Sequence, residues 1–563
     1  MNAVFCCLNS KYIHSSLAPW YLYAACKQKC TQDIHPFVVE GTINEPLENI
    51  RDRITEKNPD VVLFSCYIWN IAKTKQLCKD LKAYNPHLLT VVGGPEVSFN
   101  AQQILQENQE IGFVCAGAGE NSIPQLLTAI CDNTKTDIAG VSFRDGEKLV
   151  LSDKQAEPDD SVSPFCDEYF AAINGRIAYM ESSRGCPFRC AFCLSGRLGN
   201  VRYMNMDRVK NEILLLGNSG TKTVKFVDRT FNCNKQRAAE ILSFILENHG
   251  KTIPADVCFH FEIAADLLDE TLFDIISRLP VGSVQFEVGI QSFNEATLQK
   301  INRKTDLRKV EENVSRLLSF GNCHIHTDLI AGLPEEDFDS FVDGFNRAYA
   351  MQPHMLQLGF LKILHGSDMA INKEFYPCNH CSTPPYEVTD TPWISQQELQ
   401  KLHTAENELE RLYNSGRFRR TLAYVLRACS MTPFDLFFAF GMYIKNSSLA
   451  ESCSLDDYTN AAFAFFCTLD GVDKVQLRDC MFCDRIAGNN SGRIPEALKI
   501  PDPMLKTVKR KIMQVFPVDK GTNRSVGILY SEKAAVYCDY NEKHGISGEY
   551  TLQRIPLAEL DKV

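Results

Sequence analysis

The chain has 563 residues, of which 45% are hydrophobic and 23% charged, an ordinary balance for a globular protein. A single hydrophobic core rarely grows past about 250–300 residues, so we expect two or three domains. The net charge of −11 argues against a nucleic-acid partner, because phosphate binding usually needs a basic surface.

The first residues and the cysteines indicate a compartment. Met1-Asn2-Ala3-Val4-Phe5 lacks the charged segment and apolar stretch of a signal peptide. No uninterrupted apolar run reaches the roughly 18 residues that a membrane span needs, so we expect no membrane association. The 23 cysteines then indicate reduced thiols and metal ligands in a cytoplasmic protein, not disulfides.

Residues 1–145 alternate strand patterns with amphipathic helical patterns. Buried strands are predicted at 61–65, 88–92 and 112–115. Strand, loop and helix in repetition predict a doubly wound, Rossmann-like parallel sheet, which binds ligands at the carboxyl ends of its strands. Those ends carry Ser65, Tyr67, Gly93, Gly94, Gly117, Gly119 and Glu120. A generic nucleotide-binding domain is the alternative interpretation of this pattern.

A second series of strands and helices follows a polar linker at 146–172. Strands are predicted at 177–181, 224–228, 257–262, 284–288, 324–329 and 356–360. Six such units predict an open, partial (β/α)6 barrel over 173–380, with its chemistry at the strand carboxyl ends. Polar residues stand at those ends: Asp228, Glu262, Glu287, Gln291 and Asp328.

The loop after the first barrel strand holds three cysteines, Cys186, Cys190 and Cys193. The spacing is C-x3-C-x2-C, without a fourth cysteine nearby. A structural zinc site needs four protein ligands, and a fully protein-ligated iron–sulfur cube also needs four. Three thiolates on one loop would leave one iron of a cube open to a small molecule. A zinc knuckle or unrelated core cysteines are the alternatives.

The region 381–563 is predicted to be mostly helical and to end in a β-hairpin from Arg524. Ser395 and Glu398 form a capping-box pattern at a helix start. Two C-x2-C pairs could close a structural metal site, although the pairs are far apart in sequence: Cys378 with Cys381, and Cys480 with Cys483. Cysteines without a shared metal are the default interpretation, and the role of this region stays open.

The cysteine loop resembles the signature of the radical S-adenosylmethionine (SAM) superfamily, with Phe192 as the aromatic before the last cysteine. The resemblance implies a 4Fe-4S cluster on the three cysteines and reductive cleavage of SAM to methionine and a 5′-deoxyadenosyl radical. It also implies that Glu262 meets the SAM ammonium and Arg303 its carboxylate, a task that suits a planar guanidinium. Gln291 and Asp328 would contact the ribose, and Phe192 would also lie at the SAM site. Asp228 would orient SAM or a nearby loop.

The first domain resembles the cobalamin-binding domain that precedes many radical SAM enzymes. The resemblance implies that its three strand-end loops hold cobalamin. The D-x-H-x-x-G motif that supplies a histidine to cobalt in methionine-synthase-like proteins is absent. His14 lies in the corresponding loop region but outside such a motif, so we expect a cobalt without a histidine ligand. A vestigial domain is the alternative.

These resemblances imply a radical SAM enzyme, with methyl transfer to an unactivated carbon as the leading expectation. A cobalamin-dependent rearrangement or oxidation is the alternative, and a non-catalytic cofactor sensor is a third. The expected partners are an external electron donor of the flavodoxin or ferredoxin type and a small-molecule or peptide substrate. The sequence does not identify that substrate.

Overall fold

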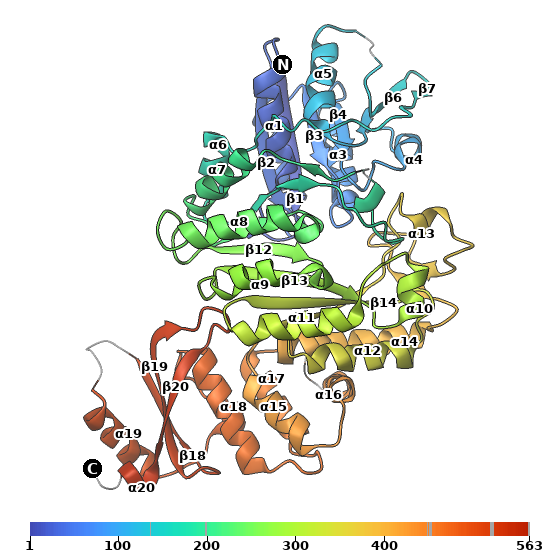
Figure 1. Ribbon diagram of the computed structural model, residues 1–563. Coiled ribbons are helices and arrows are strands. Elements are labelled where there is room, and N and C mark those ends of the chain that lie inside the picture. Colours follow the sequence, from blue (N-terminus) through green and yellow to red (C-terminus); the bar gives the residue numbers. More distant parts are fainter. Residues whose placement is uncertain (135–136, 198–199, 448, 450–452, 518–522, 561–563) are drawn as a thin grey trace.

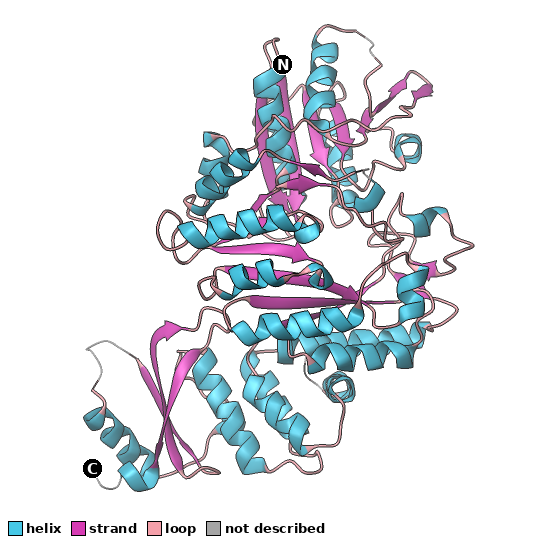
Figure 2. Ribbon diagram, viewed as in Figure 1, coloured by secondary structure: helices cyan, strands magenta, loops and turns pink. Residues whose placement is uncertain are grey.

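The computed structural model describes residues 1–134, 137–197, 200–447, 449, 453–517 and 523–560. Three parts follow one another along the molecule: an N-terminal α/β domain, a central barrel and a C-terminal region (Figure 1). Figure 2 shows strands at the centre of the first two parts and helices on their outside.

The N-terminal domain is built on a seven-stranded sheet of order β2-β1-β3-β4-β5-β6-β7. Its strands are β1 (Asn2–Asn9), β2 (His35–Thr42), β3 (Val61–Ser65), β4 (Leu89–Gly93), β5 (Phe113–Cys115), β6 (Val141–Asp145) and β7 (Lys148–Val150). Its helices are α1 (Ala18–Lys29), α2 (Leu47–Thr55), α3 (Ile71–Tyr84), α4 (Ala101–Glu107) and α5 (Gly119–Cys131). Separate apolar cores lie on the two faces of the sheet, as in a doubly wound fold.

The sheet differs from the expected all-parallel arrangement at one edge. Strands β1 to β5 are parallel, whereas β6 and β7 are antiparallel to their neighbours. The two-residue turn between β6 and β7 is Gly146-Glu147, and Gly146 supplies the positive φ, +64°, that such tight hairpins need. This short hairpin extends the first sheet to Val150, into the segment that the sequence predicts to be linker.

The central domain is a six-stranded parallel sheet of order β15-β14-β13-β12-β11-β8, which confirms the predicted (β/α)6 barrel. Its strands are β8 (Ala178–Met180), β11 (Thr223–Phe226), β12 (Cys258–Ile263), β13 (Val284–Gln291), β14 (His324–Ala331) and β15 (Met355–Phe360). Its helices are α6 (Asp167–Ile173), α7 (Met206–Gly217), α8 (Lys235–Asn248), α9 (Glu270–Ser277), α10 (Glu295–Lys300), α11 (Leu307–Phe320), α12 (Phe338–Ala350) and α13 (Asp368–Ile371). Four short strands complete this part: β9 (Ser183–Arg184), β10 (Arg202–Tyr203), β16 (Asn379–His380) and β17 (Val388–Asp390).

The barrel strands are apolar on the helix side and polar on the inner side. On β13, Val284, Phe286 and Val288 are buried, while Gln285 and Glu287 between them are partly accessible. Closed (β/α)8 barrels fill their interior with bulky branched side chains. The inner face of this open barrel carries ionisable groups instead, which makes it suited to binding a ligand.

The C-terminal region is mostly helical and ends in a small sheet. Its elements are α14 (Gln396–Glu408), α15 (Arg419–Ala428), α16 (Pro433–Asn446), α17 (Leu455–Phe466), α18 (Lys474–Gly488), α19 (Met504–Val515), β18 (Arg524–Leu529), β19 (Ala534–Lys543), β20 (Tyr550–Pro556) and α20 (Leu557–Leu560). The capping box at Ser395 and Glu398 is present. The predicted hairpin is β18–β19, and β20 adds a third antiparallel strand to it.

Contacts between the first two domains place the carboxyl edge of the first sheet against the barrel. His14 Nδ1, in the loop after β1, lies 2.6 Å from Tyr179 Oη on β8. Tyr386 Oη donates to Glu96 Oε1 at 2.6 Å, and Glu96 lies in the loop after β4. Ligand-binding edges of the two domains therefore face each other.

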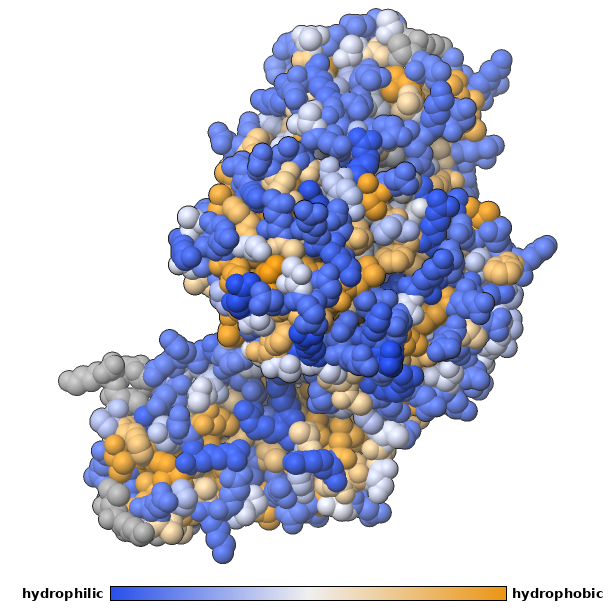
Figure 3. Space-filling view, in the orientation of Figure 1, coloured by the Kyte–Doolittle hydropathy of each residue, from blue (hydrophilic) through white to orange (hydrophobic). Residues whose placement is uncertain are grey.

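The surface gives no sign of a membrane-spanning helix. Among the described residues, no helix combines the length and the apolar composition needed to cross a bilayer. The face drawn in Figure 3 is largely hydrophilic, and hydrophobic residues gather in small patches over the barrel and the C-terminal region.

Two partly buried histidines, His324 and His354, predict sensitivity to acid. Burial, and then the neighbouring positive groups, lower the pKa of His324 to about 3 and that of His354 to about 4. An unfolded chain binds these protons near pH 6.5, so stability falls as the pH drops from that value, by about 1.4 kcal/mol per pH unit for each histidine. We expect the urea midpoint to fall between pH 7 and 5, and to fall less in a His324→Gln variant. An identical pH dependence in both proteins would contradict this assignment.

Candidate active site

The three cysteines line one pocket above the carboxyl ends of the barrel strands. Cys186, Cys190 and Cys193 share it, and it leaves about 900 Å³ free of protein atoms. Thr230 Oγ1 lies 3.5 Å from Cys186 Sγ, and the Ser195 N–H donates to Cys193 Sγ at 3.4 Å. Three sulfur donors on one loop beside an open space fit a cluster that offers one iron to a ligand.

The cysteine loop is fixed by backbone contacts to other parts of the barrel. The Ala191 N–H donates to the Ile301 carbonyl at 2.9 Å, and Asn302 Nδ2 donates to the Arg189 carbonyl at 2.9 Å. Gly196 packs closely against the backbone of Phe188, and a side chain could not fit there, because a Cβ would lie 2.2 Å from the Phe188 carbonyl oxygen. These contacts within the protein therefore fix the shape of the loop.

Asp228 supports the strand that leads into the cysteine loop. This buried carboxylate accepts the Ser182 N–H at 2.7 Å, and it accepts the hydroxyls of Ser182 and Ser183 at 2.7 and 2.6 Å. Burial raises the pKa of Asp228, and the serine contacts oppose that rise. The sequence left the role of Asp228 open; the contacts assign it to holding β8–β9.

We therefore expect Asp228→Ala to lower cluster content. It leaves three buried donors without an acceptor, at about 1–3 kcal/mol each. Asp228→Asn keeps one acceptor oxygen, and the serine hydroxyls can rotate to accept its amide, so it should retain most of the cluster. Iron and sulfide per chain after anaerobic reconstitution measure the effect. Full occupancy in Asp228→Ala would contradict the role.

All five residues predicted to contact SAM lie around the same pocket. Phe192, Glu262, Gln291, Arg303 and Asp328 line it together with the cysteines. Glu262 is on β12, Gln291 ends β13, Asp328 is on β14 and Arg303 follows α10. The structure thus brings together residues that are up to 136 positions apart in the sequence.

Several polar atoms in this pocket have no partner within the protein. Gln291 Oε1 and Arg303 Nε are buried without a hydrogen bond among the described residues. Arg303 Nη2 donates to the Gly289 carbonyl, and its Nη1 lies 3.7 Å from Cys190 Sγ. Burial raises the pKa of Glu262 to about 7, although Arg229 at 4.0 Å opposes it. A ligand with a cation and a carboxylate would satisfy these groups.

Sequence reasoning missed some of the pocket lining. Arg229, Thr230, Ala264 and Asp266 also border it. They follow β11 and β12 directly. Their position just after a barrel strand could have identified them as pocket residues from the sequence.

The predicted cobalamin loops lie at the carboxyl edge of the first sheet. The Tyr67 ring stacks on Trp69, with centroids 4.4 Å apart and planes within 6°. Trp69 is 47% exposed, and Tyr12, in the loop after β1, is 70% exposed. Sequence reasoning missed both exposed rings. Large apolar groups exposed at a ligand-binding edge fit a bulky planar ligand such as a corrin.

Two of the loop glycines have a structural role of their own, and their expected contact with cobalamin stays a prediction. Gly94 has a φ of +107°, and a Cβ there would lie 2.6 Å from the Cys66 carbonyl oxygen. A Cβ on Gly117, with a φ of +90°, would lie 2.6 Å from the Ala156 nitrogen. The close approach of other parts of the chain explains these glycines. A bulky residue at Gly94 would distort the loop itself, so it does not test cobalamin binding selectively.

Other predicted residues of this edge are engaged within the protein. Ser65 is buried, and its carbonyl accepts Asn70 Nδ2 at 3.0 Å. Gly93 and Gly119 are close to the Cys115 carbonyl and to the Leu22 side chain. The buried Glu120 carboxylate lies 2.5 Å from Arg184 Nη2, just before the cysteine loop, so it links the two domains.

The two additional cysteine pairs lie in different settings. Cys480 and Cys483 are on α18, where Cys483 packs in an apolar cluster with β18 and β19. Cys378 and Cys381 flank β16 next to the barrel. All 23 cysteines of the chain are free thiols in the structure.

Comparisons with known proteins agree with this architecture. Residues 4–127 match the B12 binding domain, 180–347 the radical SAM superfamily, and 374–527 a protein family of unknown function, DUF4080. The cobalamin-dependent radical SAM methyltransferase TokK of Streptomyces tokunonensis is 29% identical over 53% of this chain and 46% of its own. The anaerobic magnesium-protoporphyrin IX monomethyl ester cyclase of Cereibacter sphaeroides is 24% identical over 60% of this chain and 56% of its own.

A solved structure shows the same fold over most of the chain. The cobalamin-dependent SAM radical enzyme OxsB, with aqua-cobalamin and SAM bound, covers 92% of this chain and 82% of its own, at a TM-score of 0.59 and 12% identity. The chain spans about half the length of the curated relatives it matches. The chain thus joins three segments that match, in order, the B12 binding domain, the radical SAM superfamily and DUF4080.

Proposed function

We propose that this protein is a cobalamin-dependent radical SAM methyltransferase that acts on an unactivated carbon. The observation that carries the proposal is the convergence, in one pocket, of three cluster cysteines and a complete set of groups for SAM. The carboxyl edge of the B12-binding domain faces the same side of the barrel. The relative TokK is named as a methyltransferase of this kind.

The chain's own residues would bind and orient the cofactors. Cys186, Cys190 and Cys193 would hold the 4Fe-4S cluster, which supplies the electron that cleaves SAM. Glu262 would meet the ammonium of SAM and Arg303 its carboxylate. SAM would match these groups, because Arg303 Nε is buried without a partner among the described residues and partial burial makes a negative charge on Glu262 unfavourable.

Further residues complete this arrangement. Gln291 and Asp328 would contact the ribose, and Phe192 would lie beside the cluster. The loops that carry Tyr67 and Trp69 would contact cobalamin. The chain would thereby orient the cofactors and keep water from the reacting carbon.

A second candidate is a cobalamin-dependent rearrangement or oxidation. The alignment with the cyclase, over 60% of this chain, favours it. The products distinguish the two. Methyl donation by SAM leaves S-adenosylhomocysteine, whereas radical cleavage alone leaves methionine and 5′-deoxyadenosine. A protein that releases neither product would be a sensor or a scaffold.

The test is anaerobic incubation of the reconstituted protein with cobalamin, SAM and a strong reductant, followed by mass spectrometry. We expect both 5′-deoxyadenosine and S-adenosylhomocysteine. 5′-Deoxyadenosine alone would favour the second candidate or a vestigial cobalamin domain.

We further propose a cytoplasmic location, in keeping with the free thiols. We also propose an electron donor of the flavodoxin or ferredoxin type and a small-molecule or peptide substrate.

For cobalamin, we expect Trp69→Ala to weaken binding about tenfold, because it removes a large exposed ring from the proposed site. Tyr84→Ala is the matched control: Tyr84 is 69% exposed but ends α3, at the opposite edge of the sheet. Titration with hydroxocobalamin, followed by absorbance, measures both. Equal affinities in the two variants would remove Trp69 from the site.

Because the D-x-H-x-x-G motif is absent, we also expect bound cobalamin to have no histidine ligand from the protein. The EPR spectrum of bound cob(II)alamin should show no nitrogen superhyperfine splitting from an imidazole of the protein. His14 is the histidine of this loop region to test, and its Nδ1 lies 2.6 Å from Tyr179 Oη. Splitting that disappears in a His14→Ala variant would show the opposite.

A further inference from the structure

A cluster of ionisable side chains lies inside the barrel, next to the SAM pocket, which Glu287 and Asp328 both line. Glu287 on β13 is its centre. Lys225 Nζ lies 3.2 Å and His260 Nε2 3.1 Å from Glu287 Oε2. His326 Nδ1, on the next strand, lies 4.0 Å from the same oxygen. Such a charged interior is unusual for a barrel and calls for a ligand or a functional role.

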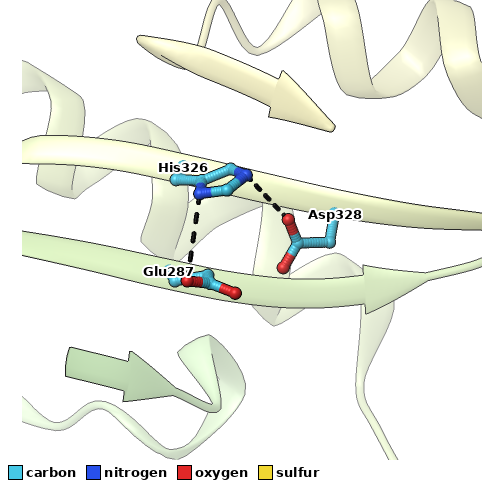
Figure 4. A group of neighbouring side chains, drawn as sticks. All are labelled: Glu287, His326 and Asp328. Atoms are coloured by element: carbon cyan, nitrogen blue, oxygen red, sulfur yellow. Dashed lines mark ion pairs between the residues drawn. The ribbon is translucent and has the colours of Figure 1, made fainter. Parts of the chain in front are cut away.

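His326 bridges two carboxylates in this cluster. Its Nδ1 faces Glu287, and its Nε2 lies 2.8 Å from Asp328 Oδ1 (Figure 4). His326 and Asp328 are two positions apart on β14, so they project to the same inner face. The His326 side chain is only 8% exposed, so its contacts are with the protein and not with bulk water.

The arrangement does not favour a metal site, although the three side chains are close enough to suggest one. A histidine gives a metal ion one nitrogen, and here a different nitrogen faces each carboxylate. The Lys225 ammonium already lies against Glu287. A chain of contacts that runs from Glu287 through His326 to Asp328 describes the geometry better.

Both ends of this chain of contacts, Glu287 and Asp328, line the SAM pocket, and His326 between them does not. Asp328 lines that pocket beside Gln291 and Glu262. Asp328 Oδ1 is buried and lies 2.8 Å from His326 Nε2, although neither atom makes a hydrogen bond of good geometry among the described residues. Within the described part of the chain, the imidazole is the ion-pair partner of the Asp328 carboxylate and can balance its charge.

We propose that His326, held between Glu287 and Asp328, is a positioning residue that sets the Asp328 carboxylate for the ribose of SAM and couples SAM affinity to pH. The inference rests on the proposed contact between Asp328 and the ribose. It goes beyond that contact, because it assigns a function to a residue that does not reach the ligand.

The electrostatics of the cluster support this role. Burial works against a charged imidazole, but Asp328 and Glu287 outweigh it and raise the pKa of His326. Lys225 opposes the rise. The other titratable groups that line this part of the barrel are His260 and Glu262 on β12 and His324 on β14, while β15 presents the uncharged Met355 and Gln357.

The sign of the pH effect follows from the bridge. A protonated His326 donates toward both carboxylates. As the pH rises through its pKa, one ring nitrogen loses its proton and presents a lone pair to a carboxylate, which weakens the bridge. SAM affinity should then fall with rising pH. Glu262 and the amino group of SAM also titrate, but they do so in every variant. Their effect therefore cancels when the dissociation constant of a variant is divided by that of the wild type at the same pH.

The experiment measures the dissociation constant of SAM from pH 6 to 8.5 on anaerobically reconstituted protein. We expect His326→Gln to weaken SAM binding about tenfold at pH 6, and the difference from the wild type to shrink toward pH 8.5. His326→Phe, which donates no hydrogen bond, should be weaker still. His260→Gln is the matched control, because it also removes a contact to Glu287 but does not touch Asp328.

A double-mutant test separates positioning from a general structural effect. In an Asp328→Asn background, His326→Gln should change SAM affinity by less than twofold, since the carboxylate that it positions is gone. Iron content per chain checks that the cluster is intact, and His326→Asn replaces any variant that fails to assemble it.

Three results would overturn the inference: an unchanged affinity in His326→Gln, an equal loss in His260→Gln, or a full loss that persists in the Asp328→Asn background. An Asp328→Asn variant with wild-type affinity would also overturn it, by removing the ribose contact. SAM cleavage by the wild-type protein would still support the proposed function in all four cases, so the two failures are distinguishable.

Discussion

Replacing Cys186, Cys190 and Cys193 together with alanine should abolish the brown iron–sulfur chromophore and all SAM cleavage. The three thiolates line one pocket, and the loop that carries them is fixed by backbone contacts elsewhere in the barrel. The variant should therefore fold and bind no iron. Iron and sulfide content, the absorbance near the visible cluster band and 5′-deoxyadenosine release measure the result; we expect about four irons per chain in the wild type and none in the variant.

Cys378→Ala is the control for this experiment. Cys378 belongs to another cysteine pair and lies next to β16, outside the pocket lining. It should keep the full cluster and normal SAM cleavage. Cleavage that survives in the triple variant, or cluster loss in the control, would show that the cluster is on other cysteines.

The barrel could be predicted from sequence because each of its strands is a short, distinct run of apolar and β-branched residues. Alternation was clear on β13, where Val284, Phe286 and Val288 face the helices, and the strand itself extends to Gln291. The predicted runs agree with the observed strands to within a few residues, since a polar or glycine-containing loop follows each one.

Some strands of the N-terminal domain and of the C-terminal region were harder to predict. Strands β1 and β2 lie before the first predicted strand, and β1 contains the polar Asn9 and two cysteines, which weaken a strand pattern. The β6–β7 hairpin falls in a polar segment, where only Asp145-Gly146 marks a turn. Strand β20 alternates exposed and partly buried residues, and pairing with β19 decides its conformation.

In the site, the order of the motifs identified the pocket lining but not the contacts within it. Sequence could place Glu262, Gln291 and Asp328 at strand ends. It could not show that Asp228 holds two serines that follow the preceding barrel strand, β8, or that His326 lies between two carboxylates. Such contacts depend on the register of neighbouring strands, which no single segment reveals.

The glycines of the first domain also show that a sequence pattern does not reveal which contacts a residue makes. Gly94 and Gly117 are positions at which the sequence pattern resembles a ligand-binding loop, yet the structure explains them by close approach of the chain's own backbone. The two exposed rings at the same edge, Tyr12 and Trp69, were not apparent, because exposure cannot be read from a residue type.

Arg303→Ala should weaken SAM binding about 30-fold or more, since a charged, buried partner is worth about 2–4 kcal/mol. The Arg303 guanidinium lies in the pocket with one nitrogen, Nε, unpaired, and it also approaches Cys190 Sγ at 3.7 Å. Arg303→Lys keeps the charge but loses the planar pair of donors, so its loss should be intermediate. Lys304→Ala, next in sequence and also bordering the pocket, is the matched control for a general loss of positive charge.

The contact with Cys190 requires a separate readout, because a loss of cluster would lower SAM binding without any loss of the carboxylate contact. Iron content per chain should stay at the wild-type value in Arg303→Ala, and a comparison of SAM with its decarboxylated analogue isolates the carboxylate. The analogue should bind the wild type weakly and lose little further affinity in Arg303→Ala. An equal loss for both ligands would mean that Arg303 supports the cysteine loop and does not hold the SAM carboxylate.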